Sequence, residues 1–520
     1  MAKSIYLVNP TADFPSYFGA EGVEAWGLPP AVCLADLTLP TLAALVPEDF
    51  EVELCDENLA PVDFDTPADF VALTGKISQW GRMRAIAAEF RRRGKTVLLG
   101  GPFASLCPEA ARGHCDILVR GELEEIAAGL FADLAASRWR REYVGTRPPL
   151  DLSPLPRWDL YPNDRTLIAT LQTSRGCPFE CEFCDVIQYL GRRQRHKPVA
   201  NVLNELDQLY RLGYRSVFLA DDNFTVVRRR AKELLAALKD WNDRQDDGKV
   251  LFSTQLSIDA ARDDDLLRMC AEAGLVHAFI GIETPNEASL KATRKPQNLG
   301  VDLVAEVGKF YQHGIMVIAG MIVGFDDDGP DIFQRQLDFA GSAAIPILTL
   351  GALVAPSATP LHERMQAEGR LSADGSEVAA APWMTNIIPK RMSQGELLEG
   401  IRWLANRLYE PSAFADRVLD FIDRFGERVD PRHRSGRGYG FRAQRPVEKD
   451  ALRMIKQIAA LGREESRMMY AIFGAVSRKP HALEPVALAL LQYAQIRHMY
   501  EKGRLWEGLP TARASAIMSG

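Results

Sequence analysis

Short apolar runs alternate with helix-length segments along the first part of the chain. The runs are SIYLVN, FEVELCDE, DFVALTG, KTVLLGGP and CDILVRGE. Strand-like runs that are separated by helical segments are typical of βαβ units and therefore of a parallel sheet. The hydrophobic pattern thus predicts an α/β domain at the start of the chain.

These runs end in small or polar residues at Asn9, Thr74-Gly75, Gly100-Gly101 and Gly121-Glu122. In an open parallel sheet such residues lie in loops at the carboxyl ends of the strands, which is the edge where ligands bind. We therefore expect a Rossmann-like domain over residues 1–145 with a ligand-binding edge.

A proline-rich stretch interrupts the alternation. Residues 146–165 include RPPLDLSPLPRWDLYP, which can form neither a regular helix nor a central strand. We interpret them as an interdomain linker. Beyond them the runs resume with one that ends in TSRGC, then SVFLADDNF, LFSTQLSID, AFIGIETP, GIMVIAGMIVGF and PILTLGALVAP, separated by helical segments such as 199–212 and 231–240.

Alternating strands and helices over residues 166–365 predict a partial or complete β/α barrel. Barrel enzymes carry their chemistry at the carboxyl ends of the strands. Here these ends carry Cys177, Asp221, Asp222, Ser257, Glu283 and Gly324. The strand signal then fades, and residues 366–520 predict a mainly helical domain, with amphipathic helix over 393–425, a loop over 434–445 and further helix to about residue 504.

The composition is that of a globular protein, because 47% of the 520 residues are hydrophobic and 25% are charged. The first residues, MAKSIYLVNPTADF, contain no apolar signal region. The most apolar runs, 315–325 and 343–356, are shorter than the roughly 18–20 residues of a spanning helix. We therefore expect a cytoplasmic protein without a transmembrane segment.

The net charge of −7 is unevenly distributed. Residues 431–520 contain 16 Lys and Arg against 7 Asp and Glu, a balance of +9 that leaves −16 for the rest of the chain. A basic end can contact an acidic partner, a phosphate group or a membrane surface, or can simply be a solvated helical face. Nothing in the sequence favours nucleic-acid binding.

The eight cysteines fall into two groups. Those at 33, 55, 107, 115 and 270 are scattered, which is unlike a disulfide framework, and we interpret them as apolar core residues. Cys177, Cys181 and Cys184 instead lie within eight residues, directly after a predicted strand. This second group is the candidate metal site.

Three thiolates at this spacing suit a [4Fe–4S] cluster with one iron left open. Each iron needs a ligand, so three cysteines leave a position where a small molecule can chelate. The alternative is a zinc site, in which His196 would complete a Cys3His set. Zinc ligands usually come from two knuckles, whereas these come from one loop at the active end of a predicted barrel.

The sequence TSRGCPFECEFCD resembles the cluster loop of the radical S-adenosylmethionine (SAM) superfamily. The resemblance implies that Cys177, Cys181 and Cys184 hold a [4Fe–4S] cluster, that SAM binds its open iron, and that Phe183 packs near the adenine. Reduction would then release a 5′-deoxyadenosyl radical.

Other strand ends also resemble SAM contacts of this superfamily. Asp221 and Asp222 stand where the family contacts the SAM amino group, and Ser257 and Glu283 where it has ribose or amino contacts. The sequence Gly320-x-Ile322-x-Gly324 resembles the glycine motif beside the adenine. Arg294 or Lys295 could hold the SAM carboxylate, although an exposed basic residue is the simpler interpretation.

The domain order resembles the cobalamin-binding class of the superfamily. The motifs GGPFAS, RGELEE, GCPFECEFCD, ADDNF, GIETP and TPLHERMQAEGRL resemble the hopanoid C-2 methylase group. That resemblance implies a Rossmann-like cobalamin-binding-type domain, a partial (β/α)6 radical SAM barrel and a C-terminal helical extension. Candidate cobalamin contacts are Thr74, Gly75, Gly101, Ser105 and Glu122.

One position departs from the pattern of base-off cobalamin proteins. Where these carry Asp-x-His-x-x-Gly, the chain has Asp56-Glu57-Asn58-Leu59-Ala60-Pro61, so residue 58 offers no histidine to cobalt. The hopanoid-like group also has asparagine here. Either cobalamin binds without a histidine, or the domain does not use it.

These observations leave three functional hypotheses. The first is a cobalamin-dependent C-methyltransferase acting on an unactivated carbon of a lipid-like or natural-product substrate. The second is a radical SAM enzyme without methyl transfer, which would catalyse rearrangement, oxidation or aminocarboxypropyl transfer. The third is a non-catalytic metal scaffold or electron carrier. Expected partners are a small-molecule substrate, a one-electron donor such as flavodoxin or ferredoxin, and a membrane surface at the basic C-terminal region.

Overall fold

The computed structural model describes residues 3–17, 19, 21–379, 381–426 and 445–506. The chain forms two compact units. Unit 1 comprises residues 1–14, 30–224 and 354–379, and unit 2 comprises residues 15–29, 225–353 and 380–520. The loop expected over residues 434–445 lies almost entirely outside the described residues.

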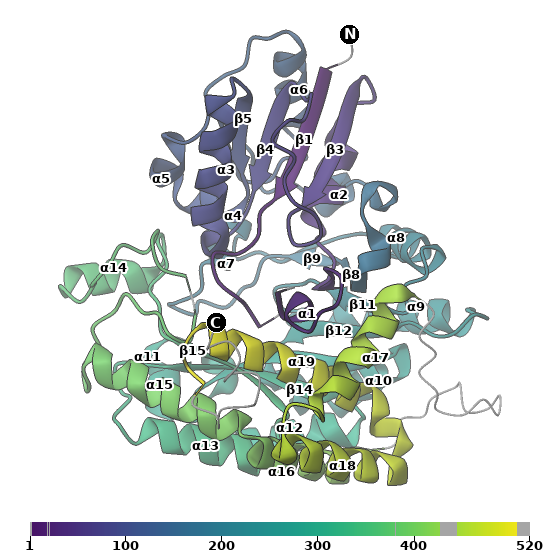
Figure 1. The fold of residues 1–520 in the computed structure, drawn as a ribbon, viewed down its shortest axis with the longest axis vertical. Helices are drawn as coiled ribbons and strands as arrows, with labels where there is room; N and C mark the ends of the chain where they lie inside the picture. Colours follow the sequence, from purple (N-terminus) through teal and green to yellow (C-terminus); the bar gives the residue numbers. More distant parts are fainter. Residues whose placement is uncertain (1–2, 18, 20, 380, 427–444, 507–520) are drawn as a thin grey trace. The chain divides into compact units, whose positions relative to one another are not determined.

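Unit 1 begins with a sheet of parallel strands (Figure 1). Its strand order is β3-β1-β4-β5-β6-β7. The strands are β1 (Lys3–Asn9), β3 (Phe50–Asp56), β4 (Phe70–Thr74), β5 (Thr96–Gly100), β6 (Ile117–Arg120) and β7 (Glu142–Val144). The first five coincide with the five predicted runs, so the predicted Rossmann-like arrangement is confirmed, and the short β7 is an addition.

Both faces of this sheet are covered. Helix α2 (Thr38–Leu45) packs against β1 and β3, and α3 (Trp80–Arg92) packs against β4 and β5. Val8, Leu73 and Leu99, from neighbouring strands, are buried in the core. Strands that are covered on both faces need near-continuous apolar runs, which is the pattern of the sequence.

Unit 1 also contains three further parallel strands. The order is β2-β8-β11, all parallel, with β2 (Val32–Leu34), β8 (Thr166–Leu171) and β11 (Ser216–Leu219). A two-stranded antiparallel ribbon, β9 (Ser174–Arg175) and β10 (Arg195–His196), follows β8. The pattern predicted β8 and β11 but missed β2, β9 and β10, because runs of two or three residues carry no periodicity.

Unit 2 carries the remaining strands in the order β12-β13-β14-β15, again all parallel. They are β12 (Leu251–Leu256), β13 (Leu275–Glu283), β14 (Met316–Val323) and β15 (Ile347–Ala352). Every strand that was predicted over residues 166–365 is therefore present, and β12, β13, β14 and β15 are each followed by a helix. The chain carries the βα repeats expected of a partial barrel.

The helices fall into the same two units. Unit 1 also contains α4 (Gly101–Leu106), α5 (Pro108–Arg112), α6 (Ala127–Ala135), α7 (Val186–Leu190), α8 (Val199–Arg211) and α14 (Pro360–Ala367). Unit 2 contains α1 (Glu21–Ala25), α9 (Arg228–Asp243), α10 (Asp264–Ala273), α11 (Glu287–Ala292), α12 (Leu303–Gln312), α13 (Ile332–Ser342), α15 (Gln394–Tyr409), α16 (Pro411–Arg424), α17 (Pro446–Ile458), α18 (Arg463–Arg478) and α19 (Leu483–Lys502).

The helix expected over residues 393–425 is two helices. Ser393 and Glu396 form a capping box at the start of α15. The helix is interrupted at Glu410, because Pro411 opens α16. Among the described residues, no helix is both long and apolar enough to cross a membrane.

Two tyrosines pair with the outer edge of β15. The Tyr409 hydroxyl accepts the Leu348 N–H at 2.9 Å and donates to the Leu348 carbonyl at 2.6 Å. The Tyr17 hydroxyl does the same at Leu350, at 2.8 and 2.7 Å. An unpaired strand edge is prone to association, and these hydroxyls satisfy it within the unit.

The predicted fold class is confirmed: an α/β chain with a parallel N-terminal sheet, the βα repeats of a partial barrel and a mainly helical C-terminal region. The boundaries at residues 145, 165 and 365 stay predictions. Of the scattered cysteines, Cys55 and Cys270 are buried as expected, whereas Cys33, Cys107 and Cys115 are only partly buried.

Candidate active site

The cluster loop, residues 176–184, begins directly after β9 and is anchored by a glycine. Gly176 has φ +94°, and a β-carbon there would lie 2.7 Å from the Arg193 carbonyl oxygen and 2.9 Å from that of Gly191. A left-handed conformation and two backbone oxygens at this range leave room for glycine alone. The Gly of the motif TSRGC is therefore a geometric requirement.

Backbone hydrogen bonds hold both ends of the loop. The Gly176 N–H donates to Asp222 Oδ2 at 2.6 Å, and the Cys177 N–H donates to the Gly191 carbonyl at 3.2 Å. At the other end the Cys184 N–H donates to the Cys181 carbonyl at 3.0 Å. These bonds define the turn that carries the three thiols.

The three cysteines lie in one loop and form no disulfide within the described residues. Cys181 is buried, and Cys177 and Cys184 are partly exposed. Burial raises the pKa of Cys184 to about 12, and the charges of Asp185 and Cys181 add to the shift. Three sulfur ligands from one loop are the donor set of a [4Fe–4S] cluster with an open iron, so these residues fit that group.

No group of three His, Cys, Asp or Glu side chains that could hold a single metal ion occurs among the described residues. The Cys3His set of the zinc alternative is therefore not assembled among the described residues. His196 lies on β10, opposite Ser174.

The two neighbouring aspartates after β11 do different work. Asp221 is buried, and its carboxylate accepts the N–H groups of Thr173 and Ser174, at 2.7 and 2.8 Å, and the Thr173 hydroxyl. Asp222 accepts only the Gly176 N–H, so its Oδ1 makes no hydrogen bond within the described residues. Burial raises the pKa of Asp222 to about 6. Asp222 is therefore the better placed of the two to bind a ligand.

In unit 2, Glu283 ends β13 in a constrained conformation. Its φ is +64°, which is uncommon for a residue with a side chain and is found at functional sites. The carboxylate is buried and forms an ion pair with Lys295, which is buried as well. Arg294 is exposed, so of the two basic candidates only Lys295 belongs to this cluster.

The glycine motif at the end of β14 is held by a residue that the sequence did not indicate. Asp328 Oδ2 accepts the N–H groups of Gly324 and Phe325 at 3.0 and 3.1 Å. Its Oδ1 accepts from the Ser289 hydroxyl at 2.8 Å and the Asn286 amide at 3.1 Å. Gly324 has φ +110°, with Leu397 2.9 Å from the position of a β-carbon.

Of the remaining predicted SAM contacts, only Ser257 lies at a strand end. Ser257, directly after β12, is buried. Gly320 lies within β14, where Phe279 would be 3.2 Å from a β-carbon. Phe183 is partly buried in the cluster loop.

The predicted cobalamin contacts meet at the carboxyl edge of the N-terminal sheet. Gly101 has φ +86°, and a β-carbon there would lie 2.5 Å from Thr74 Oγ1 and 2.9 Å from the Gly75 nitrogen. The Ser105 hydroxyl donates to the Gly101 carbonyl at 2.9 Å and accepts the Gly121 N–H at 3.0 Å. Glycine loops thus pack tightly along this edge, while the Ser105 hydroxyl is already used internally.

Two further residues of this edge are engaged within the protein. The Glu122 carboxylate is buried and pairs with Arg175 and Arg195. Asn58 folds back on its own loop, and its side-chain amide donates to Asp56 Oδ1 at 2.8 Å. The edge therefore offers glycine backbone to a ligand, and residue 58 offers no imidazole to a cobalt ion.

Sequence reasoning missed several residues of the candidate site. Around the cluster loop they are Arg175, Arg195, Glu182, Arg364 and Glu124, and in unit 2 the sequence did not indicate Asp328. Arg175 and Arg364 stand within the quoted motifs TSRGC and TPLHER, and Glu124 within RGELEE, so the motifs contained a signal. The pairing itself joins residues that are far apart in sequence, which a linear pattern does not show.

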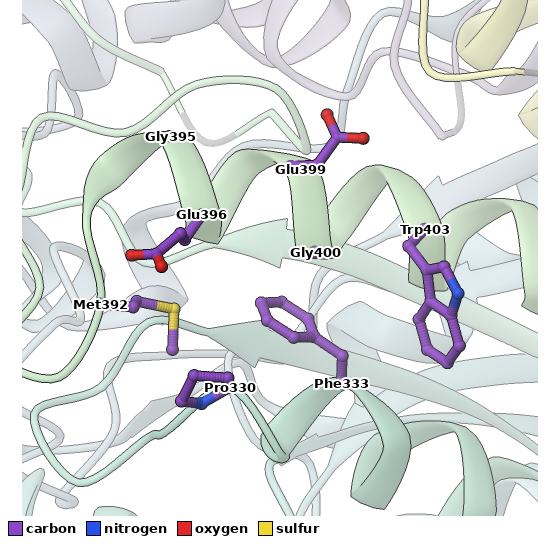
Figure 2. Close-up of a pocket in the computed structure, with 8 residues that line it drawn as sticks. All are labelled: Pro330, Phe333, Met392, Gly395, Glu396, Glu399, Gly400 and Trp403. Atoms are coloured by element: carbon purple, nitrogen blue, oxygen red, sulfur yellow. The ribbon is translucent and has the colours of Figure 1, made fainter.

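An apolar groove of about 500 Å³ lies between α13 and α15 in unit 2 (Figure 2). Phe333, Met392 and Trp403 point into it, and Phe333 packs against Gly400, where a β-carbon would collide with the ring. None of the predicted site residues lines this groove.

Comparisons with known proteins agree with the geometry of the cluster loop. The Radical SAM superfamily model matches residues 171–340, and a domain of unknown function, DUF4070, matches residues 359–504. An uncharacterized methyltransferase of Synechocystis sp. is 37% identical over 74% of this chain and 73% of its own length. The hopanoid C-2 methylase of Rhodopseudomonas palustris is 35% identical over 65% of each protein.

Solved structures show the same fold at low identity. The radical SAM methyltransferase TsrM from Kitasatospora setae, with cobalamin and a [4Fe–4S] cluster bound, has a TM-score of 0.60 at 16% identity and covers 92% of this chain and 100% of its own. The cobalamin-dependent radical enzyme OxsB has a TM-score of 0.62 at 15% identity, over 99% of this chain and 83% of its own.

The similarity to the Synechocystis protein covers 74% of the chain, which is more than a shared cluster loop requires. It is accompanied by the match of the superfamily model to the segment that carries the three cysteines. The chain therefore belongs to the radical SAM superfamily of enzymes and, within it, to the family of the Synechocystis methyltransferase.

Proposed function

We propose that this enzyme is a cobalamin-dependent C-methyltransferase that modifies an unactivated carbon of a lipid-like or natural-product substrate. The observation that carries the proposal is the glycine-anchored loop with three cysteines, in the same compact unit as a Rossmann-like sheet. Relatives that are named as methyltransferases support the reaction class.

The residues of the cluster loop have separable tasks in this proposal. Cys177, Cys181 and Cys184 would hold the cluster, which when bound supplies the electron that cleaves SAM. Asp222 has a carboxylate oxygen available for the SAM amino group. Asp221 instead holds the backbone N–H groups of Thr173 and Ser174, which precede the loop. Glu283 and Lys295 form a buried pair that would bind a zwitterionic ligand through both of its charges.

The carboxyl edge of the N-terminal sheet fits cobalamin in one respect and limits it in another. Gly75 and Gly101 allow backbone to approach a large ligand closely. Since residue 58 is an asparagine that bonds its own loop, cobalamin would bind here without a histidine ligand from that position. The chemistry it supplies when bound is transfer of a methyl group to a carbon radical.

The decisive experiment measures iron and cobalt per chain in protein purified without oxygen from cobalamin-fed cells. The proposal expects about four irons, one cubane cluster, and about one cobalt. Label from methyl-labelled SAM should then appear in the product of a candidate substrate. Iron without cobalt, and no label in any product, would reject methyl transfer.

A second candidate keeps the radical SAM core without methyl transfer. The anaerobic magnesium-protoporphyrin IX monomethyl ester cyclase of Synechocystis sp. is 28% identical over 41% of this chain, so similar chains are named for another reaction. For rearrangement, oxidation or aminocarboxypropyl transfer, the protein would contain iron and cleave SAM, but its activity would not require cobalt. Adding cobalamin to cobalt-free protein distinguishes the two, because only the methyltransferase depends on it.

The proposal includes contact with an anionic membrane surface through the exposed face of α18. Tyr470 is 87% exposed and Phe473 is 42% exposed, and exposed Arg463 and Arg467 lie on the same side of the helix. Tyrosine and arginine side by side suit the interface of an anionic bilayer, where each basic residue contributes about 1 kcal/mol. The contact would bring the enzyme to a lipid-like substrate.

Sedimentation with vesicles tests this contact. Binding should require anionic lipid, weaken with salt and fall in the double variant Tyr470→Ser/Phe473→Ser. Trp403→Ser, an exposed aromatic residue on α15, should leave vesicle binding unchanged. Equal binding of the wild type to anionic and neutral vesicles, or none, would contradict the contact.

A further inference from the structure

The cluster loop is clamped by ion pairs on its N-terminal side. Arg175, the residue before Gly176, donates from Nη1 to Glu122 Oε2 at 2.6 Å and to Glu124 Oε1 at 2.7 Å. Arg195, on the partner strand β10, donates to the same Glu122 carboxylate at 2.5 and 2.9 Å. The side chains of all four residues are at most 12% exposed. We call this set the first clamp.

A second clamp holds the middle of the loop. Glu182, between the second and third cysteines, forms a two-bond ion pair with Arg364, from Nε at 2.6 Å and Nη2 at 3.1 Å. The Glu182 carbonyl also accepts the Leu361 N–H at 3.1 Å. Both partners belong to the first turns of α14, which Thr359 caps and Pro360 opens.

The residues that pair with the cluster segment, Glu122, Glu124 and Arg364, come from other parts of the chain. Glu122 and Glu124 follow β6 at the carboxyl edge of the N-terminal sheet, and α14 follows the last strand. Both clamps lie within unit 1. The motif RGELEE supplies the carboxylates of the first clamp, and the motif TPLHER supplies the guanidinium group of the second.

Burial makes the first clamp different from ordinary surface salt bridges, and in the second clamp the Glu182 side chain is 9% exposed and that of Arg364 31%. A buried pair that loses one partner leaves a desolvated charge, so its geometry is held strongly once it is formed. Arginine in a two-bond arrangement also fixes direction as well as distance. A carboxylate between two cluster ligands can therefore hold the backbone that aims their thiols.

We propose that Arg175 and Arg364 are positioning residues that set the cluster loop, and that Glu122 ties this loop to the ligand edge of the N-terminal sheet. The inference rests on the proposed function only in taking residues 176–184 as the cluster-binding loop. Occupation of the N-terminal edge and the shape of the cluster loop would then depend on each other through Glu122.

Amide hydrogen exchange of the cluster-free protein tests the clamps without any chemistry. Arg364→Lys keeps the charge but loses the two-bond geometry. We expect the peptide that spans residues 176–184 to exchange about tenfold faster, the change that about 1.4 kcal/mol produces. Glu122→Gln should have the same effect on residues 174–178.

The matched control is Arg92→Lys. Arg92 forms the same kind of two-bond pair with Glu89, from Nε at 2.8 Å and Nη2 at 2.7 Å, but its side chain is 69% exposed. This variant should leave exchange in the cluster loop unchanged. Unfolding temperatures of all variants show whether the change is local or global.

A second measurement separates positioning from mere stabilisation. After anaerobic reconstitution, the reduced clusters of the Arg364→Lys and Glu122→Gln variants should give altered electron paramagnetic resonance spectra on addition of SAM, while Arg92→Lys matches the wild type. Wild-type exchange and spectra in both clamp variants would overturn the inference. Since exchange is measured without cluster or SAM, that outcome is distinct from a wild type that fails to cleave SAM, which would reject the proposed function.

Discussion

Replacing Gly176 by alanine tests whether backbone geometry at the start of the cluster loop controls cluster binding. The residue has φ +94°, and its missing β-carbon would lie 2.7 and 2.9 Å from two backbone carbonyl oxygens. Because these oxygens belong to the chain between Gly191 and Arg193, they cannot rotate away as a side chain would. The substitution therefore combines an unfavourable conformation with a collision.

The magnitude follows from adding the two effects. The left-handed conformation costs a non-glycine residue about 1–2 kcal/mol. Inserting a carbon into a filled space costs about 1–3 kcal/mol more. We expect Gly176→Ala to destabilise the local structure by about 2–5 kcal/mol, enough to displace Cys177, the next residue, from its position.

Two other glycines of unit 1 separate the contributions. Gly94 has φ +78° with nothing within 4 Å of a β-carbon, so its alanine variant should lose only about 1 kcal/mol, the conformational part. Gly129, inside α6, has neither a positive φ nor a neighbour within 4 Å. Its alanine variant should gain about 0.5–1 kcal/mol.

The assays are the unfolding free energy of the cluster-free protein and iron per chain after anaerobic reconstitution. We expect the order of stability Gly129→Ala, wild type, Gly94→Ala, Gly176→Ala, and a loss of iron in the last variant alone. If Gly176→Ala is as stable as Gly94→Ala and binds as much iron, the geometric reasoning about the cluster loop is wrong.

Three further predictions concern other parts of the chain. Cys181→Ala should lose iron and 5′-deoxyadenosine formation, whereas Cys270→Ala should keep both; equal iron in the two would contradict the ligand assignment. Glu283→Gln should lower the free energy of unfolding in denaturant by about 3–5 kcal/mol, because it leaves the buried Lys295 ammonium unpaired. Adding Lys295→Met should recover this stability but not SAM binding, which equilibrium dialysis measures. Tyr409→Phe should cost about 2–5 kcal/mol, since one N–H and one carbonyl of β15 lose their partner, and an unchanged unfolding midpoint would refute this.

Local patterns were sufficient to place the long strands and to bring the three cysteines into one loop after a strand. Each long apolar run became a strand, since its short length and its polar, glycine-rich ends favour a buried strand over a buried helix. Short elements escaped: β2 and β9 are too brief to show a period, and β2 is defined by pairing with β8 far along the chain. Glu410-Pro411 divided one predicted helix into two.

The roles within the site were less accessible from sequence. Asp221 and Asp222 are adjacent and chemically identical, yet Asp221 accepts three hydrogen bonds whereas Asp222 keeps one carboxylate oxygen available. Lys295 and Arg294 are likewise adjacent, and only one is buried with Glu283. Such differences depend on which way a side chain points, and periodicity does not specify that in a loop.

The sequence by itself determined the order of strands and helices, the three thiols in one loop and the glycine that the loop requires, because each depends on residues that are close together along the chain. Only the tertiary structure decided which charges are paired. Glu122 with Arg175, and Glu182 with Arg364, meet across 53 and 182 residues of sequence. Burial strengthens the Glu122–Arg175 pair and covers the Glu182 carboxylate, and burial is a property of the folded chain that no single segment carries.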